Sequence, residues 1–419
     1  MLGKTILLFM VVLYTIKIKK PTIHSSNKKF KSMSLSFVFP LFFVFSGYFQ
    51  TLLRDKIMCK PSKYAVKRKL VFEISDDLKI HVDHYRYFSV FNENIKTTQN
   101  LLQKSCGFLV SFFFRKIKNN VLCLEKPDNV LIVHGLHGHS ECNYIIKTVN
   151  VFLNKNCNVF CLNARGINGS ICKTTDYTHI GHTEDIEMLC SYIKQFYNSK
   201  ILLIGYSQGS NQIAMFMAKK RKRRFSFKTK NKADSMSIIK VAKDMHKKDT
   251  FKIHSDVLGA VSICNPFDFK KLEDVMMQKG FIASLCTKKI VKLFQTHLCQ
   301  VLNHVKNIKE IVNKPTCVSI TQNLIENSIL KAKNVETFLY ENSCSFYIHK
   351  IKKNTLFINI TDDPIIPLEV VPYKKILKNK NTGLILLEGG HLGFKTVNFG
   401  FSLKNTLEMY YDLLREQYT

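Results

Sequence analysis

Ser207 has the sequence surroundings of a nucleophile. It lies at the centre of residues 205–209, GYSQG, which fit the pattern Gly-x-Ser-x-Gly. An apolar, strand-like segment (200–204) leads into the pattern, and a segment with helical spacing follows it. A sharp turn between such elements needs glycine on both sides of the serine, and it places the serine Oγ at a helix N-terminus, where negative charge is stabilised. These features predict that Ser207 attacks an electrophilic carbon such as an ester carbonyl.

A serine alcohol needs a base to activate it and an acid to orient that base. Two later loops supply both, in the chain order serine, acid, histidine. Residues 355–360 read as a strand that ends in TDDPIIP, and residues 383–387 as one that ends in EGGHLGF. Asp363, directly before a proline, is the predicted acid, with Asp362 as its rival, and His391 is the predicted base. Both loops follow strands at their carboxyl ends, where α/β sheets place their sites.

The tetrahedral intermediate of such a reaction also needs backbone N–H donors. Residues 134–140, HGLHGHS, follow a strand-like run and provide a glycine-rich loop for this purpose. The N–H groups of Leu136 and of Gln208, the residue after the nucleophile, are the predicted oxyanion hole. The three histidines of the loop could suggest a metal site, but their spacing and the lack of a fixed carboxylate argue against it. We therefore expect no metal and no cofactor.

The elements that must position these residues alternate along the chain. Alternation of strands and helices predicts an α/β fold with a mostly parallel central sheet and helices on both faces. An antiparallel pair of strands precedes it, at 69–74 and 78–84. The further strands expected are 129–133, 159–162, 201–204, 257–263, 355–360 and 383–387, and the helices are 144–153, 186–196 and 211–219.

Composition and charge bound the domain organisation. The chain has 419 residues, 46% of them hydrophobic, which excludes a disordered or fibrous chain. The net charge of +32 is concentrated in two segments: residues 1–70 carry 14 Lys and Arg against one Asp, and residues 218–254 carry 14 against three. We expect an N-terminal hydrophobic and basic arm at 1–45 and an α/β domain at 46–419. A helical cap is expected at 266–350.

The basic stretch at 219–254, which opens with KKRKRR, breaks the periodic pattern. We interpret it as a solvated, partly disordered surface insertion that could contact anionic lipid. A nuclear-localisation or nucleic-acid patch is the alternative. Because the charge is confined to this insertion and the arm, a nucleic-acid partner is not expected. The 13 cysteines have irregular spacing and are expected to be reduced.

Two apolar runs, at 5–16 and 35–45, favour contact with a membrane surface. Each is about a dozen residues long, whereas a helix needs about 20 to cross a bilayer. A short anchor, a hairpin in one leaflet and a signal-peptide core therefore stay open for the first run, and a strand or loop covering the core for the second. We expect the protein at an intracellular membrane such as the endoplasmic reticulum.

Eight motifs in order give the chain a resemblance to a known family, the membrane-anchored esterases and phospholipases of the α/β-hydrolase fold. This branch includes the medium-chain fatty-acid ethyl ester esterase/synthases. The resemblance extends from about residue 46 to the C-terminus. The segments that carry it are GYFQTL (47–52), HGLHGHS (134–140), NARGINGS (163–170), YTHIGHTED (177–185), GYSQGSN (205–211), CNPFDF (264–269), DDPIIP (362–367) and GGHLGF (389–394).

The resemblance implies the α/β-hydrolase fold, the triad Ser207, Asp363 and His391, and membrane attachment. This chain departs from the family at Tyr48, which replaces a histidine, and at Gln208 and Ser210, which replace Leu and Gly beside the nucleophile. The insertion at 219–254 is a further departure, and the cap shows little likeness.

The sequence thus predicts a serine hydrolase that cleaves carboxylic esters of lipid-like substrates, such as an acylglycerol, a phospholipid or a fatty-acid ester. Transfer of the acyl group to an alcohol is the close alternative. An inactive hydrolase scaffold that binds anionic membrane or RNA through its basic segments is the alternative from another class. Acyl chain length, headgroup and oligomeric state stay open.

Overall fold

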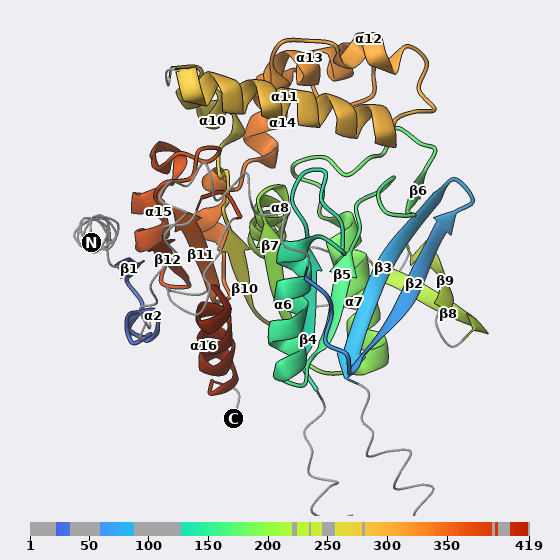
Figure 1. Ribbon diagram of the computed structural model, residues 1–419, viewed down its shortest axis with the longest axis vertical. Coiled ribbons are helices and arrows are strands. Elements are labelled where there is room, and N and C mark those ends of the chain that lie inside the picture. The colour runs from blue at the N-terminus through green and yellow to red at the C-terminus, as the bar shows by residue number, and fades with distance from the viewer. Residues whose placement is uncertain are drawn as a thin grey trace, which may run out of the picture.

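The central feature of the molecule is one long, twisted sheet (Figure 1). The computed structural model describes residues 22–33, 59–87, 127–219, 224–233, 236–244, 256–278, 281–387, 390–392 and 403–417. Within these residues, twelve strands join in this sheet, eleven of them in the order β1-β12-β11-β10-β7-β4-β5-β3-β2-β9-β8, with β6 paired to β3. The strands are β1 (Thr22–Ser25), β2 (Ala65–Ser75), β3 (Leu78–Tyr87), β4 (Asn129–Val133), β5 (Asn158–Leu162), β6 (Ile171–Cys172), β7 (Ile201–Tyr206), β8 (Arg224–Ala233), β9 (Met236–Asp244), β10 (Val257–Ile263), β11 (Thr355–Ile360) and β12 (Thr382–Leu387).

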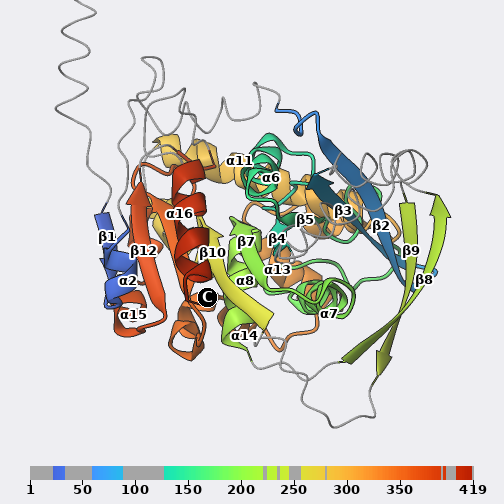
Figure 2. The same cartoon turned by 90° about the horizontal axis from the view of Figure 1, so that it is seen from below.

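Helices cover both faces of this sheet and one end of it (Figures 1 and 2). Those packed on the faces are α6 (Asn143–Asn154), α7 (Glu184–Tyr197), α8 (Gln208–Ala218), α15 (Tyr373–Lys378) and α16 (Leu403–Arg415). Those at the end are α10 (Phe269–Gln278), α11 (Phe281–Val301), α12 (Ile308–Val312), α13 (Cys317–Glu326) and α14 (Val335–Asn342). Short turns of helix occur at α2 (Lys28–Lys31), η1 (Cys344–Phe346), η2 (Ile348–Lys350) and η3 (Leu368–Val370).

The middle of the sheet is parallel, from β12 through β11, β10, β7 and β4 to β5. All residues of β4, β7 and β11 are buried, as expected for strands that helices cover on both sides. Successive side chains point to opposite faces, so Leu203 joins the core under α7 and α8, while Leu202 joins the core under α6 and α16. The predicted fold class is confirmed.

Toward both ends of the sheet most strand pairs are antiparallel. β2 and β3 form the predicted antiparallel pair, with Leu70 opposite Val82 and Phe72 opposite Ile80. The helices and strands predicted along the body all occur, and most bounds agree within two or three residues, because their apolar periodicity reflects real burial.

The basic segment after α8 corrects one expectation. We predicted a partly disordered surface insertion at 219–254, but residues 224–244 contain an antiparallel hairpin, β8 and β9. β9 pairs parallel to β2, and so the hairpin extends the sheet. Phe227 and Ile239 are buried in the same core as Phe72. Along β8 and β9, apolar side chains alternate with polar ones, and so one face of the hairpin is apolar and can be buried.

The N-terminal arm also needs correction. Residues 22–33 fall inside the arm predicted at 1–45, but β1 pairs antiparallel with β12, and Phe30 is buried against Tyr410. The Ser25 hydroxyl donates to Thr382 O at 2.9 Å. The apolar runs at 5–16 and 35–45 and the segment 47–52 lie outside the described residues. Among the helices that are described, none is both long and apolar enough to span a bilayer.

The helices α10 to α14 form a layer over one end of the sheet, as Figure 1 shows in golden yellow to orange at the top. They have an apolar core of their own, which includes Leu298, Leu302, Ile320 and Leu324. This layer corresponds to the segment expected as a cap, and we call α10 to α14 the cap below. The cap lies over the cavity that Ser207 and His391 line.

Candidate active site

Ser207 occupies a strained turn between β7 and α8. Its backbone has φ 51° and ψ −116°, a combination that residues with a Cβ rarely adopt. A Cβ on Gly205 would lie 2.4 Å from Gly209 O, and one on Gly209 would lie 2.4 Å from His134 O. The predicted need for glycine on both sides thus has a direct steric cause. The Ser207 N–H donates to Ile263 O at 2.8 Å and so fixes the turn to β10.

Asp363 and His391 meet although 28 residues separate them. His391 Nδ1 lies 2.8 Å from Asp363 Oδ2, and both side chains are buried. The other carboxylate oxygen of Asp363 accepts the N–H groups of Ile365 and Ile366 at 2.8 and 2.9 Å. These donors fix the carboxylate, which accepts the Nδ1 proton and leaves Nε2 of the imidazole as the basic nitrogen. The rival Asp362 is exposed, and its Oδ1 accepts the Gly390 N–H at 3.2 Å.

The loop of residues 134–140 passes close to Ser207. A Cβ on Gly135 would lie 3.1 Å from Ser207 Cβ and 3.8 Å from its Oγ. The Gly135 N–H donates to the Tyr144 hydroxyl at 3.2 Å, so it is already engaged. The next N–H along this loop is that of Leu136, one of the two predicted oxyanion donors.

His134 holds this loop in place. Its Nε2 accepts the Ala164 N–H at 3.0 Å, and its Nδ1 lies 2.7 Å from Gly135 O. Burial lowers the pKa of His134 to about 4, so the ring is neutral at physiological pH. With both nitrogens engaged by backbone groups, His134 has a structural role, consistent with the argument against a metal ion at the histidines of this loop.

Several site residues line one cavity of about 530 Å³, a volume that suits a ligand with a long apolar chain. Ser207, His391, Leu136 and Gln208 all line it. The cap contributes a mainly apolar wall, made by Leu272, Met276, Ile290, Val291, Leu293, Phe294, Val318, Phe338 and Leu339. Four of the five predicted site residues therefore line one apolar cavity, and the fifth, Asp363, is hydrogen-bonded to His391.

This cavity has little positive charge, in contrast to the chain as a whole. Among the described residues that line it there is no Lys or Arg, and Glu273 is the acidic side chain. Burial lowers the pKa of His179 and of His297 to about 3, which keeps both rings neutral. Burial also raises the pKa of Glu273, whose carboxylate accepts the Val318 N–H at 3.2 Å.

One set of side chains near the site could hold a metal ion. Cys264 Sγ, a carboxylate oxygen of Asp363 and a ring nitrogen of His391 lie within 4.8 Å of one another. Within this set, His391 and Asp363 are hydrogen-bonded to each other. Cys264 directly follows β10 and is fully buried. Sequence reasoning missed its proximity, because a lone cysteine after a strand carries no pairing signal.

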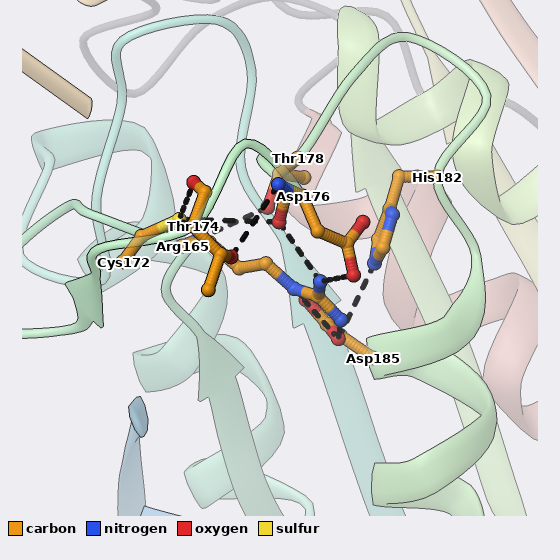
Figure 3. A network of polar contacts seen from close by, with 7 residues as sticks. All are labelled: Arg165, Cys172, Thr174, Asp176, Thr178, His182 and Asp185. Carbon is orange, nitrogen blue, oxygen red and sulfur yellow. Dashed lines mark hydrogen bonds and ion pairs between the residues drawn. The ribbon is translucent and has the colours of Figure 1, made fainter. Parts of the chain in front are cut away.

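Sequence reasoning also missed the role of a buried ion pair beside the site (Figure 3). Arg165 is 1% exposed, and its Nε and Nη2 donate to the Asp185 carboxylate at 3.0 and 2.7 Å. Its Nη1 donates to Asp176 O at 2.9 Å and contacts the Asp176 carboxylate. Burial alone would raise the pKa of Asp185, but the Arg165 charge and His182 hold it well below its ordinary value. Arg165 and Asp185 lie within two of the quoted segments, NARGINGS and YTHIGHTED, which were the available signal.

Comparison with known proteins agrees with this geometry. A family model described as alpha/beta hydrolase fold matches residues 128–226, which contain Ser207. Abhydrolase domain-containing protein 2 of Drosophila melanogaster is 26% identical over 286 residues, or 64% of each chain. Monoacylglycerol lipase ABHD2 of Homo sapiens is 22% identical over 292 residues, which cover 65% of this chain and 61% of that protein. The chain thus spans less than two thirds of the length of these relatives.

Among solved structures, an esterase from Pyrococcus furiosus aligns over 84% of this chain and 91% of its own, with a TM-score of 0.45 and 12% identity. The sheet order, the turn at Ser207 and the family model that matches residues 128–226 agree on an α/β-hydrolase fold, and the relatives similar to this chain include lipases.

Proposed function

We propose that the protein is a serine hydrolase that cleaves the carboxylic ester of a neutral lipid such as a monoacylglycerol. The observation that carries the proposal is the hydrogen bond between Asp363 and His391, together with the apolar cavity that His391 and Ser207 both line. A hydrolase of short polar esters has no need of such a chamber, whereas a fatty acyl chain gains free energy from each buried methylene, roughly 0.8 kcal/mol.

In the reaction that we propose, each predicted residue has one role. His391 Nε2 accepts the Ser207 proton as Oγ attacks the ester carbonyl carbon, while Asp363 holds the imidazole and stabilises its positive charge. The Leu136 and Gln208 N–H groups donate to the oxyanion that forms. The intermediate collapses, and the leaving alcohol takes the proton from His391. Water then attacks the acyl-enzyme by the same route and releases the fatty acid and Ser207.

The charge of the cavity supports a neutral headgroup. A phosphate ester needs a cation or a cluster of N–H donors to replace its water. No Lys or Arg is present among the described lining residues, and Glu273 would repel a phosphate. An uncharged glycerol, which donates and accepts hydrogen bonds, suits the neutral histidines and Glu273 better. The printed name of the human relative, a monoacylglycerol lipase, points the same way.

The test is fluorophosphonate labelling of the full chain, together with release of oleate from monooleoylglycerol and from a matched lysophospholipid. Ser207→Ala should lose both labelling and turnover. Ser191→Ala, which removes a buried hydroxyl of α7 that donates to Glu187 O, is the matched control and should retain both. A folded wild-type protein that neither labels nor hydrolyses would contradict the proposal. Added ethanol in the assay separates hydrolysis from acyl transfer, because transfer yields the ethyl ester.

The proposal includes attachment to an intracellular membrane through the apolar runs at 5–16 and 35–45. The test is flotation with liposomes of the full chain and of a variant that lacks residues 1–20. This truncation leaves β1 intact, so loss of flotation reports on the first run rather than on damage to the sheet. Equal flotation of both proteins would remove the first run from the proposal.

A further inference from the structure

Three amide side chains at the start of α8 donate hydrogen bonds to the loop that precedes α7. Each donates to a different carbonyl of three successive residues in that loop. The bonds run from Gln208 Nε2 to Thr178 O at 3.2 Å, from Gln212 Nε2 to His179 O at 2.8 Å, and from Asn211 Nδ2 to Ile180 O at 2.9 Å. We call residues 176–182 the clasp loop. These three bonds fix the clasp loop against the first turns of α8, the helix that follows Ser207.

The other side of the clasp loop is held by Arg165 (Figure 3). The Arg165 N–H donates to the Thr178 hydroxyl at 2.9 Å, and its guanidinium donates to Asp176 O at 2.9 Å. Asp185, in the first turn of α7, takes the remaining guanidinium donors. The loop thus lies between an ion pair that is almost fully buried and the amides of α8.

Thr178 connects the two sides. Its hydroxyl accepts from Arg165, and its carbonyl accepts from the Gln208 side chain. The Gln208 backbone carries one of the two proposed oxyanion donors. A displacement of the clasp loop would therefore act on the residue whose N–H must point at the oxyanion.

We propose that the Gln208 side chain is a positioning residue for the oxyanion hole, anchored through Thr178 to the buried Arg165–Asp185 pair. This inference rests on the proposed function. Leu, the family residue at this position in the resemblance noted above, has no donor for the Thr178 carbonyl. The bond from Gln208 to Thr178 is thus the part of this arrangement that departs from the family pattern, and the proposal gives that departure a positioning role.

The central test is Gln208→Leu, which keeps the backbone N–H and removes the amide. Removal of a whole oxyanion donor costs about 10²–10³ in kcat, so loosening one should cost roughly 10-fold. KM should stay within about twofold, because Gln208 is one of many residues that line the cavity and the apolar wall made by the cap is unchanged. The affinity for a trifluoromethyl ketone, which forms a tetrahedral adduct at Ser207, should fall by the same factor as kcat/KM.

A matched control separates positioning from general stability. Asn379→Leu removes a side-chain amide that donates to two carbonyls, Ile348 O and Ile351 O at 2.7 and 3.0 Å, away from the cavity. It should lower the midpoint of urea unfolding without changing kcat. If Gln208→Leu behaves like Asn379→Leu, with unchanged kcat and adduct affinity, the inference is wrong.

The anchor is tested at Thr178, because Arg165 is buried and its variants could fail to fold. Thr178→Val removes the hydroxyl that accepts from Arg165 and should reduce kcat, whereas Thr178→Ser keeps the hydroxyl and should restore it. The effects of Thr178→Val and Gln208→Leu should be less than multiplicative, since both break one connection. Fully multiplicative effects would overturn the coupling. An inactive, unlabelled wild type would instead refute the proposed function itself.

Discussion

Ser207 shows how local strain and neighbouring glycines depend on each other. A left-handed φ at a residue with a Cβ costs about 1–2 kcal/mol, and the turn persists because the surrounding backbone fixes it. Gly209 lies so close to the end of β4 that a Cβ would be 2.4 Å from His134 O and 2.6 Å from Val133 O. These neighbours are backbone atoms of a central strand and its loop, so neither can move cheaply.

Gly209→Ala is therefore expected to destabilise the protein by at least about 3 kcal/mol and to abolish esterase activity. Gly383→Ala is the contrasting change, because its Cβ would meet the Phe30 ring at 2.9 Å, and a ring beside the outer strand β1 can shift. Urea unfolding and ester turnover of both variants check this. Similar losses in the two proteins would contradict the distinction between backbone and side-chain neighbours.

The acid of the proposed triad can be assigned by comparing two adjacent aspartates. Asp363→Asn should reduce kcat on the order of 10⁴-fold, because an amide cannot hold His391 in the tautomer that leaves Nε2 basic. Asp362→Asn should keep most of the activity, since this exposed carboxylate accepts a backbone N–H rather than the imidazole. Turnover of a soluble nitrophenyl ester measures both. Equal losses would show that the loop, rather than the Asp363 carboxylate, is what matters.

For single residues, the sequence predicts a role when local context and order along the chain define it. It does not predict a role that depends on contact with a residue from a distant segment. Asp363 and His391 could be paired because each follows a late strand in a fixed order. The side-chain bond from Gln208 to Thr178 could not, because it joins two loops whose separation only the folded sheet determines. The Arg165–Asp185 pair was present in quoted motifs, but a single sequence does not say which charges are buried together.

At the scale of elements, the hairpin of β8 and β9 shows where composition misleads. Its lysines suggested a solvated loop, whereas its alternation of Phe225 and Phe227 with polar residues is the period of a strand with one buried face. Phe227 packs on the rings of Phe72, Tyr192 and Phe196. The bounds of the central strands, by contrast, were predicted to within one or two residues. A short, uninterrupted apolar run is typical of a strand that is buried on both faces.

Phe227→Ala should lower the free energy of unfolding by about 3 kcal/mol, since it leaves a cavity between the hairpin and α7. Activity per folded molecule should stay unchanged, because the hairpin extends the far edge of the sheet from Ser207. Lys228→Ala, at an exposed neighbour on the same strand, is the control and should have no effect on stability. Unfolding in urea decides the matter, and an unaltered midpoint for Phe227→Ala would mean that the hairpin is not part of the cooperative fold.

Because cap residues line the cavity, we expect the cap to determine which acyl chains reach Ser207. Ile290 on α11 lines the cavity and is partly exposed to it, so a larger side chain there can extend into the chamber. Ile290→Trp should reduce kcat/KM for a long-chain ester at least 10-fold relative to a butyrate ester, because the distal methylenes lose their space. A chain-length series of nitrophenyl esters measures this. Uniform loss across all chain lengths would place the acyl chain elsewhere.

For the whole molecule, the balance of charge and burial predicts sensitivity to acid. The chain is strongly basic, yet among the described residues four buried histidines have their pKa lowered so far that their rings are neutral at pH 7. Burial lowers the pKa of His134 to about 4 and that of His84, His179 and His297 to about 3. In the unfolded chain each titrates near 6.5, so the two states bind different numbers of protons below that pH.

Stability should therefore be complete above pH 6.5 and fall as the pH decreases toward the folded pKa values of 3 to 4, because only the unfolded chain gains protons in that window. At pH 5.5 each histidine contributes a loss of about 1.4 kcal/mol. Four such losses are comparable to the roughly 5–15 kcal/mol that stabilises a domain. Urea unfolding at pH 7.5, 6.5 and 5.5 measures the slope. His297→Gln should flatten it by about a quarter, whereas His304→Gln, at an exposed position, should leave it unchanged. A stability that does not change between pH 7.5 and 5.5 would mean that the unfolded state retains the burial of these rings, or that the folded protein admits water to them.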